Sequence, residues 1–257
     1  MPELPEAETI VRSLQRLVQG RHIVKADFLS RRVSGDSPQA LAGRRVVQLR
    51  RYGKKILFEL DQGLLLVDLR MTGRLLMNHV PGPYTRAVLR LDDGVLLFDD
   101  IRQFGSLRIL EKEPESAGPD PFEISCERFC DCLRGRSRRL KTTLLDQSFV
   151  RGLGNIYADE ILFRARLHPM LKTDRLTRPR AAALHEAMRE TLAEAIVYRG
   201  SSVSDYVDGT GQKGSFQLRH EVYRKQGQPC PICQTAIRRI VVGQRGTHFC
   251  PHCQRLR

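Results

Sequence analysis

The spacing of apolar residues changes along the chain, and this change decides which fold classes are open to it. Between about residues 21 and 110 the apolar residues come in runs of four to six, the pattern of β-strands. Asp61-Gln62-Gly63 and Asp92-Asp93-Gly94 each separate two such runs and predict hairpin turns. Short strands joined by tight turns predict an antiparallel sandwich. The clearest runs are 46–49, 56–60, 64–69, 88–91, 95–98 and 107–110.

Helical spacing lies on both sides of this strand region. A first helix is expected from about Glu3 to Val18, because it carries one apolar stripe and has acidic residues near its start. The chain therefore predicts an α+β fold, in which a β-sandwich with a flanking helix precedes a helical domain. The later helices are expected after a cap at Ser125, over 139–145, after Asn155 and over 179–198.

Two Cys-x2-Cys pairs stand near the C-terminus, with sixteen residues between them. Each pair supplies two thiolates from one tight turn, which is what a tetrahedral four-thiolate zinc site requires. Because all four positions are cysteine, the predicted site is closed and structural. A redox pair and a chance pattern are the competing interpretations. The four predicted ligands are Cys230, Cys233, Cys250 and Cys253.

The residues between the two cysteine pairs predict a β-hairpin. Two apolar segments, 237–242 and 247–249, flank the glycine-bounded turn at 243–246, which contains Arg245. An arginine at such a turn can simply be solvated. In a strongly basic protein it is also a candidate for contact with a phosphate group.

The charge of the chain points to a polyanionic partner. Lys and Arg number 43 against 29 Asp and Glu, which gives a net charge of +14 and a pI near 9.9. Arginine outnumbers lysine, and arginine suits bidentate phosphate contacts. The alternative is a generic basic protein encoded by a GC-rich genome. No apolar run reaches the length of a membrane span and no secretory signal is visible, so we expect a cytoplasmic protein without membrane contact.

Thiols stay reduced in the cytoplasm, so metal binding or burial is expected of the seven cysteines rather than disulfide formation. Three of them, Cys126, Cys130 and Cys132, have no assigned role. At their spacing they are expected to be buried or half-buried helix residues.

The N-terminal residues Met1-Pro2-Glu3-Leu4-Pro5-Glu6 suggest covalent chemistry. Removal of Met1 would leave Pro2 with a free secondary amine, and an α-amino group titrates near pH 8, about two units below lysine. Such amines attack electrophilic carbon and form Schiff bases. Glu3, next to that amine, is placed to move protons. Many chains begin with Met-Pro, and most of those prolines have no chemical role.

Residues 151–160 join two expected helices through a glycine turn. Glycines before a helix allow backbone N–H groups to approach an anion. The third glycine of a dinucleotide fingerprint is absent and no βαβ unit surrounds the segment, so a Rossmann fold is disfavoured. A plain bend between helices, with Asn155 as the cap, is the other interpretation.

Three motifs together resemble the bacterial formamidopyrimidine-DNA glycosylase family, and they occur in that family's order along the whole chain. They are 2–9 (PELPEAET), 154–158 (GNIYA) and the four cysteines. The resemblance implies an enzyme of base excision repair that excises oxidised purines, such as 8-oxoguanine and formamidopyrimidines, and then cuts the strand by β,δ-elimination. A sister endonuclease acting on oxidised pyrimidines and a non-catalytic binder of damaged DNA are the alternatives.

The resemblance also implies the roles of the catalytic residues. Pro2 corresponds to the nucleophile that forms a Schiff base with the sugar, and Glu3 to the acid and base beside it. Glu6 corresponds to a carboxylate that organises the site, although it is equally a first-turn helix charge. Lys54 corresponds to a lysine of a β-hairpin. It is preferred over Lys55, because neighbouring residues of a strand point to opposite faces and Lys55 would lie on the other face. Glu3, Lys54 and Arg245 are the expected proton donors.

The remaining implied residues contact DNA. Met71, Arg102 and Phe104 correspond to the side chains that fill the gap left by the extruded nucleotide. Ordinary strand core is the alternative for the two apolar ones. Asn155 and Arg245 are expected to bind phosphates, and Lys141 matches a further basic position. The glycine-rich stretch 207–216 corresponds to a loop that covers the extruded base. No residue of this stretch is assigned to recognition of the lesion.

From these observations we expect four regions along the chain. They are a catalytic β-sandwich domain at 1–112, a linker at 113–124, a helix–two-turns–helix domain at 125–221 that includes the covering loop, and a zinc finger at 222–257. The expected cofactor is one structural Zn²⁺. The expected partner is double-stranded DNA with oxidised bases or abasic sites, bound by a monomer near the bacterial nucleoid.

Overall fold

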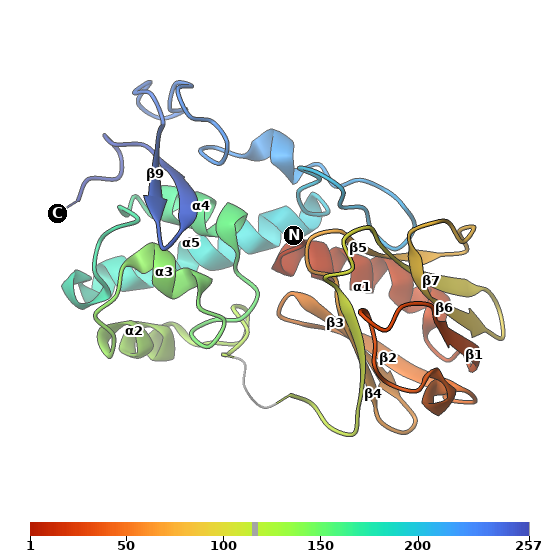
Figure 1. Cartoon of the computed structure of the whole chain (residues 1–257). Helices are drawn as coiled ribbons and strands as arrows, with labels where there is room; N and C mark the ends of the chain where they lie inside the picture. Colours follow the sequence, from red (N-terminus) through yellow and green to blue (C-terminus); the bar gives the residue numbers. More distant parts are fainter. Residues whose placement is uncertain (115–117, 257) are drawn as a thin grey trace. The chain divides into compact units, whose positions relative to one another are not determined.

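The computed structural model describes residues 1–114 and 118–256 and divides the chain into two compact units (Figure 1). The N-terminal unit comprises Met1–Glu115 and Ile196–Gln217, and the C-terminal unit comprises Ser116–Ala195 and Leu218–Arg257. The segment Ile196–Gln217 thus groups with the N-terminal unit, whereas the sequence places it within the helical domain. The expected linker at 113–124 includes residues 115–117, which lie outside the described residues.

The N-terminal unit is built from two antiparallel sheets of four strands, in the orders β1-β6-β7-β5 and β2-β3-β4-β8. The turns at 61–63 and 92–94 connect β3 to β4 and β6 to β7, as the sequence predicts. The elements are α1 (Leu4–Val18), β1 (Ile23–Phe28), η1 (Pro38–Leu41), β2 (Val46–Tyr52), β3 (Lys55–Leu60), β4 (Leu64–Asp68), β5 (Gly73–Met77), β6 (Thr85–Leu91), β7 (Val95–Asp100) and β8 (Ser106–Leu110).

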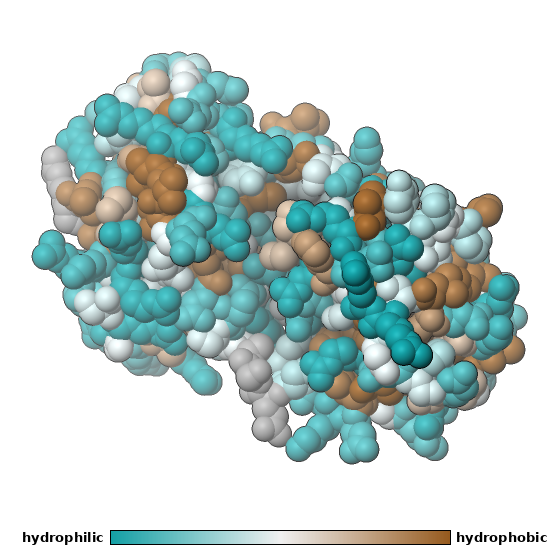
Figure 2. All heavy atoms as spheres, in the orientation of Figure 1, coloured by the Kyte–Doolittle hydropathy of each residue, from teal (hydrophilic) through white to brown (hydrophobic). Residues whose placement is uncertain are grey.

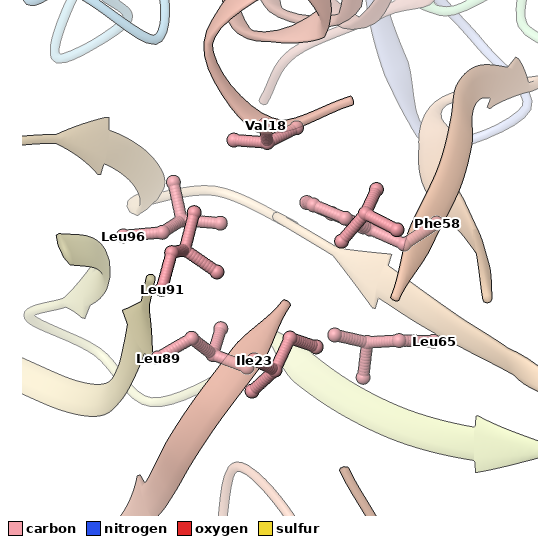
Figure 3. Close-up of a pocket in the computed structure, with 8 residues that line it drawn as sticks. Val18, Ile23, Phe58, Leu65, Leu89, Leu91 and Leu96 are labelled. Atoms are coloured by element: carbon pink, nitrogen blue, oxygen red, sulfur yellow. The ribbon is translucent and has the colours of Figure 1, made fainter. Parts of the chain in front are cut away.

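One hydrophobic core joins both sheets to helix α1. The apolar stripe of α1 packs into it, with Ile10 and Leu14 fully buried. Figure 3 shows the apolar side chains around a small cavity there, including Val18 of α1, Phe58 of β3 and Leu96 of β7. The cavity volume is about 10 Å³, so the core is close-packed. Truncating Phe58 to alanine would cost about 3–5 kcal/mol by leaving a larger void. This packing fixes the start of α1 relative to both sheets.

Most of the regular secondary structure of the C-terminal unit is helical, and the helices lie close to the positions expected. The side chain of Ser125 accepts a hydrogen bond from the Arg128 backbone and caps α2, as predicted. Gly154, and not Asn155, is the cap of α4, so Asn155 is the first helical residue. The elements are α2 (Cys126–Arg134), α3 (Leu140–Leu145), α4 (Asn155–Arg164), η2 (Thr173–Arg175), α5 (Arg178–Val197), η3 (Phe216–Arg219), β9 (Arg238–Val242) and β10 (Arg245–Phe249).

Strands β9 and β10 form the predicted hairpin, which Figure 1 shows in blue beside α4. Behind the hairpin, the Gln254 side chain donates to the Leu167 carbonyl at 2.8 Å and accepts from the Cys250 backbone at 2.8 Å. These bonds tie the last turn of the chain to the loop after α4. The α+β fold, with a β-sandwich, a helical region and a cysteine-bearing hairpin, is therefore confirmed.

Cysteines 126, 130 and 132 lie on α2 with different exposures. Cys130 is buried and Cys132 is half-buried, but Cys126 is exposed, so the expectation of burial was wrong for it. Cys126 is the first residue of α2, where no preceding helical turn covers a side chain. Among the described residues, no helix is both long and apolar enough to cross a membrane.

Candidate functional site

The start of helix α1 holds Pro2 and Glu3 in a fixed geometry. The backbone N–H of Glu3 donates to Oε2 of Glu6 at 2.8 Å, and the Glu3 side chain accepts the backbone N–H of Glu6 in return. This reciprocal capping box satisfies two donors that a helix start leaves without partners. Pro2 is buried, and the exposed fractions of Glu3 and Glu6 are 3% and 1%. The first residues are thus held in place by the helix they precede.

The second oxygen of Glu6 binds a segment far away in the sequence. Its Oε1 accepts the backbone N–H of Ser201 at 2.7 Å. Gly200 has a φ of +74°, and a Cβ atom there would lie 2.6 Å from the same oxygen, so only glycine fits at this position. The Tyr206 hydroxyl lies 3.4 Å from the Glu6 carbonyl oxygen, and burial, followed by the nearby Glu6, raises the pKa of Tyr206. Glu6 therefore connects the start of α1 to residues 200–206.

Further contacts fasten the glycine-rich stretch within the N-terminal unit. The backbone of Gly209 donates to the Ser13 hydroxyl at 3.0 Å, and its carbonyl accepts from the Met77 backbone at 2.9 Å. Asp208 is fully buried and binds the Arg199 side chain. Burial would raise the pKa of Asp208, but hydrogen bonds from Gln212, Thr210 and Arg199 outweigh it and lower this pKa. The stretch is thus an ordered loop.

Lys54 lies in the two-residue turn between β2 and β3, not on a strand face. Its neighbour Lys55 is on β3, with Nζ 3.6 Å from a carboxylate oxygen of Asp68. The hairpin is attached to α1 by an ion pair, because Arg51 Nε lies 3.1 Å from Oε2 of Glu8. Glu8 is on the helix whose first residues are Pro2 and Glu3. This ion pair therefore fixes the hairpin of Lys54 relative to the N-terminal residues.

Met71, Arg102 and Phe104 occupy two neighbouring loops, so neither apolar residue is ordinary strand core. Met71 is 47% exposed and Phe104 is 55% exposed, and the Arg102 guanidinium lies 4.4 Å from the centre of the Phe104 ring. The buried carboxylate of Asp100 joins the loops, because it binds the Thr72 hydroxyl and the backbone N–H groups of Arg102 and Gly105. The structure thus joins the two loops that carry the three side chains and leaves these side chains exposed.

Asn155 and Arg245 come together in the C-terminal unit. The Asn155 side-chain amide donates to the Gly246 carbonyl at 3.0 Å, next to the exposed Arg245 at the start of β10. The Oδ1 atom of Asn155 is buried with no hydrogen-bond partner within the described residues. An amide with one bonded hydrogen retains a second donor. The first turn of α4 and the turn of the hairpin therefore form one polar surface.

Lys141 is fully buried and binds Oδ1 of Asp159 on α4. The other oxygen of Asp159 accepts the His248 backbone N–H at 2.9 Å and lies 3.1 Å from its Nδ1. One carboxylate thus connects α3, α4 and β10. A buried charge is tolerated when it is paired and hydrogen-bonded, as Asp159 is.

Glu160, the next residue, anchors the chain before the cysteine-bearing module. Its carboxylate accepts three backbone N–H groups, those of Glu221, Val222 and Tyr223, at 2.9, 3.1 and 2.8 Å. Burial raises the pKa of Glu160 to about 7, although the three hydrogen bonds act to lower it. Sequence reasoning missed Asp100, Asp159 and Glu160. Their signal was an acidic residue inside or directly after an apolar segment, where burial requires partners.

The four cysteines converge as the sequence predicts, with all four sulfur atoms within 4.8 Å of one another. The Sγ atoms of Cys230 and Cys253 lie 3.9 Å apart, and those of Cys233 and Cys250 lie 3.5 Å apart. Four thiolates at Zn–S distances of about 2.3 Å around a tetrahedral ion would be about 3.8 Å apart. The cluster fits one structural zinc ion.

Comparisons with known proteins cover the chain from end to end. Residues 1–107 match the formamidopyrimidine-DNA glycosylase N-terminal domain, and residues 117–207 match the formamidopyrimidine-DNA glycosylase H2TH domain. Residues 227–256 match the zinc finger found in FPG and IleRS. The formamidopyrimidine-DNA glycosylase of Solibacter usitatus is 50% identical over 264 residues, covering 99% of this chain and all of the relative.

Two solved structures share the fold. MutM (Fpg) of Thermus thermophilus has a TM-score of 0.90 at 41% identity and covers 98% of both chains. A mutant of Lactococcus lactis Fpg, solved with DNA containing Fapy-dG, has a TM-score of 0.92 at 32% identity, covering 99% of this chain and all of that one.

Proposed function

Because this chain belongs to the formamidopyrimidine-DNA glycosylase family, we propose that it is a DNA glycosylase and AP lyase of base excision repair. Its substrate is double-stranded DNA that carries oxidised purines or abasic sites. The observation that carries this proposal is the capped start of α1, where Glu6 holds the Glu3 backbone next to Pro2. A mutant of a relative, with a TM-score of 0.92, binds DNA containing Fapy-dG, which is consistent with a purine lesion as substrate.

In the proposed reaction the free amine of Pro2 attacks C1′ of the damaged nucleotide. The glycosidic bond breaks and its electron pair leaves with the base. The nitrogen of Pro2 then passes its proton to Glu3, and Glu3 protonates the ring oxygen of the sugar as the C1′–O4′ bond opens, which leaves an iminium ion between Pro2 and C1′. Loss of a C2′ proton then expels the 3′ phosphate, and a second elimination expels the 5′ phosphate. Hydrolysis of the imine restores the amine.

The other predicted residues have supporting roles in this proposal. Lys54 lies on the hairpin that Arg51 and Glu8 attach to α1, and it would bind a phosphate next to the lesion. Lys54 and Arg245 stay predicted as further proton donors. Met71 and Phe104 would fill the space left by the extruded nucleotide, since their exposure at a loop surface suits insertion between bases.

The C-terminal unit would bind the phosphate backbone. Asn155 and Arg245 share one polar surface, and the zinc ion holds the hairpin that carries Arg245. A zinc ion bound by four thiolates has no open position, so its contribution is structural. Lys141 would act indirectly, because its buried ammonium binds Asp159 and supports the hairpin through His248. We place the enzyme in the bacterial cytoplasm, as a monomer close to the nucleoid.

Borohydride trapping tests the reaction. The wild-type protein is expected to form a covalent adduct with a duplex containing a single 8-oxoguanine and to leave phosphate at both ends of the gap. A binder without catalysis would give no adduct. An adduct formed faster on oxidised pyrimidines than on oxidised purines would favour the sister endonuclease activity instead.

A further inference from the structure

A basic hollow in the C-terminal unit lies outside the site described above. Its volume is about 310 Å³, and it is lined by Arg139, Met170, Leu171, Lys172, Arg175 and Leu256. The three cationic side chains are exposed, and within the described residues no ion pair of theirs is recorded. The nearby Arg136 and Arg138, in contrast, both pair with Asp146.

The backbone holds two of these cations against each other. Arg139 and Lys172 are partners in an antiparallel bridge, and the Leu140 N–H donates to the Leu171 carbonyl at 2.8 Å beside them. Residues directly opposite in such a pair project to the same face, and like charges there repel each other. This repulsion is relieved when an anion binds between them. The geometry thus favours a ligand with negative charge.

The lining favours contact with a phosphate over recognition of a nucleobase. It contains no carboxylate, amide or aromatic side chain that would read or stack on a base. Arginine and lysine bind phosphate, and the apolar side chains of Met170, Leu171 and Leu256 suit the faces of deoxyribose. The chemistry of the hollow therefore matches a sugar–phosphate backbone.

Helix α3 connects the hollow to the proposed phosphate-binding hairpin. Arg139 precedes α3, and Thr142 in its first turn packs on the hairpin, since a Cβ atom on Gly243 would lie 2.6 Å from Thr142 Cγ2. Three residues of helix span about 5 Å, and phosphates of one strand recur about every 3.4 Å along the duplex axis. Arg139 and the turn of the hairpin therefore lie at neighbouring positions along α3, separated along the helix by a length comparable to the phosphate spacing of one strand.

We propose that this hollow is an additional binding site for the backbone phosphates of the DNA flanking the lesion, with Arg139 and Lys172 as its main contacts. The inference rests on the proposed function, because it needs duplex DNA as the ligand. Hydrophilic residues cover most of the face seen in Figure 2, and the net charge of +14 matches such a partner. The hollow would extend the phosphate contacts and leave the chemistry of base removal unchanged.

The salt dependence of binding tests this site. Each phosphate contact contributes about 0.9 to the slope of log K against log salt concentration. The variant Arg139→Gln/Lys172→Gln is therefore expected to lower the slope on a lesion duplex by between about one and two units. Its single-turnover cleavage rate at saturating enzyme should stay within about twofold of wild type, and it should retain one zinc per chain.

Two control variants separate this site from a change in net charge or in folding. Arg16→Gln/Arg90→Gln removes two exposed cations from the N-terminal unit and should change the slope by less than half a unit. Arg139→Lys/Lys172→Arg keeps both charges and should restore the wild-type slope. Equal slopes in the Arg139→Gln/Lys172→Gln variant and wild type would overturn the proposal, and so would an equal loss in the Arg16→Gln/Arg90→Gln control.

Inorganic phosphate, titrated alone, distinguishes a site for small anions. Submillimolar binding that disappears in Arg139→Gln/Lys172→Gln, together with an unchanged DNA slope, would assign the hollow to a free anion and refute the DNA site. Borohydride trapping by the wild-type protein reports the proposed function separately. A lowered slope without any trapping would retain this site and reject the catalytic assignment.

Discussion

Oε1 of Glu6 lies 2.7 Å from the backbone nitrogen of Ser201, although the two residues are 195 positions apart in the chain. The other oxygen of the same carboxylate accepts the backbone N–H of Glu3. One buried side chain thus fixes both the residue next to the proposed nucleophile and the segment that leads into the glycine-rich loop. The order of the loop and the position of Pro2 are coupled through this contact.

Glu6→Gln should therefore impair the proposed active site. The Glu6 carboxylate accepts the backbone N–H groups of Glu3 and Ser201 on different oxygens, and a glutamine amide can accept at only one side, so one of these donors loses its acceptor. Loss of one hydrogen bond to a charged group costs about 2 kcal/mol. We expect a comparable loss in the free energy of unfolding in urea and borohydride trapping at least about tenfold slower. Glu186→Gln, on the exposed side of α5, is the matched control and should change neither measurement.

Pro2→Gly should abolish trapping while binding to DNA survives, because the phosphate contacts lie on other residues. A protein that retains Met1 should behave in the same way, since its proline nitrogen is part of a peptide bond. Trapping on abasic duplexes and intact-mass measurement of the same sample check this prediction together. Undiminished strand cutting by either protein would rule out Pro2 as the nucleophile.

Most of the fold follows from local patterns, whereas the contacts that organise the site do not. Strands such as β3 and β4 were predictable from continuous apolar runs around an Asp-Gln-Gly turn. Strand β1 was missed because a bulge between Ile23 and Lys25 breaks its alternation. The Glu6–Ser201 contact has no local signature, because its acceptor and donor meet only after both sheets and α5 have formed.

In the C-terminal unit, the sequence likewise predicted which residues bind the metal but not which side chains pair with each other in the interior. Cysteine spacing alone predicted the zinc cluster, since tetrahedral thiolate coordination restricts the spacing. The buried Lys141–Asp159 pair was not predictable, because a lysine on a short helix has the same pattern whether it faces solvent or a carboxylate. Lys141 remains predicted as a DNA contact, but its burial favours an indirect role.

Removal of zinc should weaken DNA binding by at least about tenfold. Structural zinc contributes directly to folding, and here it holds the hairpin that presents Arg245. We expect a chelator to lower the melting temperature and the affinity together, and added Zn²⁺ to restore both. Cys126→Ser, outside the cluster, should retain one zinc per chain and normal affinity. Normal binding by the zinc-free protein would contradict the proposed role of the hairpin.

Arg245→Ala should lower the salt slope of DNA binding by about one unit, the contribution of a single phosphate contact. Arg245 is exposed beside the turn of the hairpin, where Asn155 contacts the neighbouring Gly246. Arg238 lies at the opposite end of the same hairpin, paired with Phe249, so Arg238→Ala should leave the slope unchanged. Identical slopes for Arg245→Ala and wild type would remove Arg245 from the phosphate contacts.

His220 should make the protein less stable in mild acid. Burial, together with the charges of Lys225 and Arg224, lowers the pKa of His220 to about 4 from its ordinary value of 6.5. The unfolded chain therefore binds the proton first as the pH falls. The stabilisation is fully present above pH 6.5 and is lost progressively toward pH 4. Between pH 6.5 and 5.5 the loss amounts to about 1 kcal/mol.

The variant His220→Gln isolates this effect. Glu160 has a raised pKa and acts in the opposite direction, but it is present in both proteins and cancels in their difference. Urea unfolding of the zinc-loaded proteins at pH 6.5 and 5.5 should show a loss in wild type that exceeds the loss in His220→Gln by about 1 kcal/mol. Zinc content is measured at both pH values, because protonation of the thiolates would add a separate loss. Equal pH dependence in the two proteins would show that His220 is not held neutral by its burial.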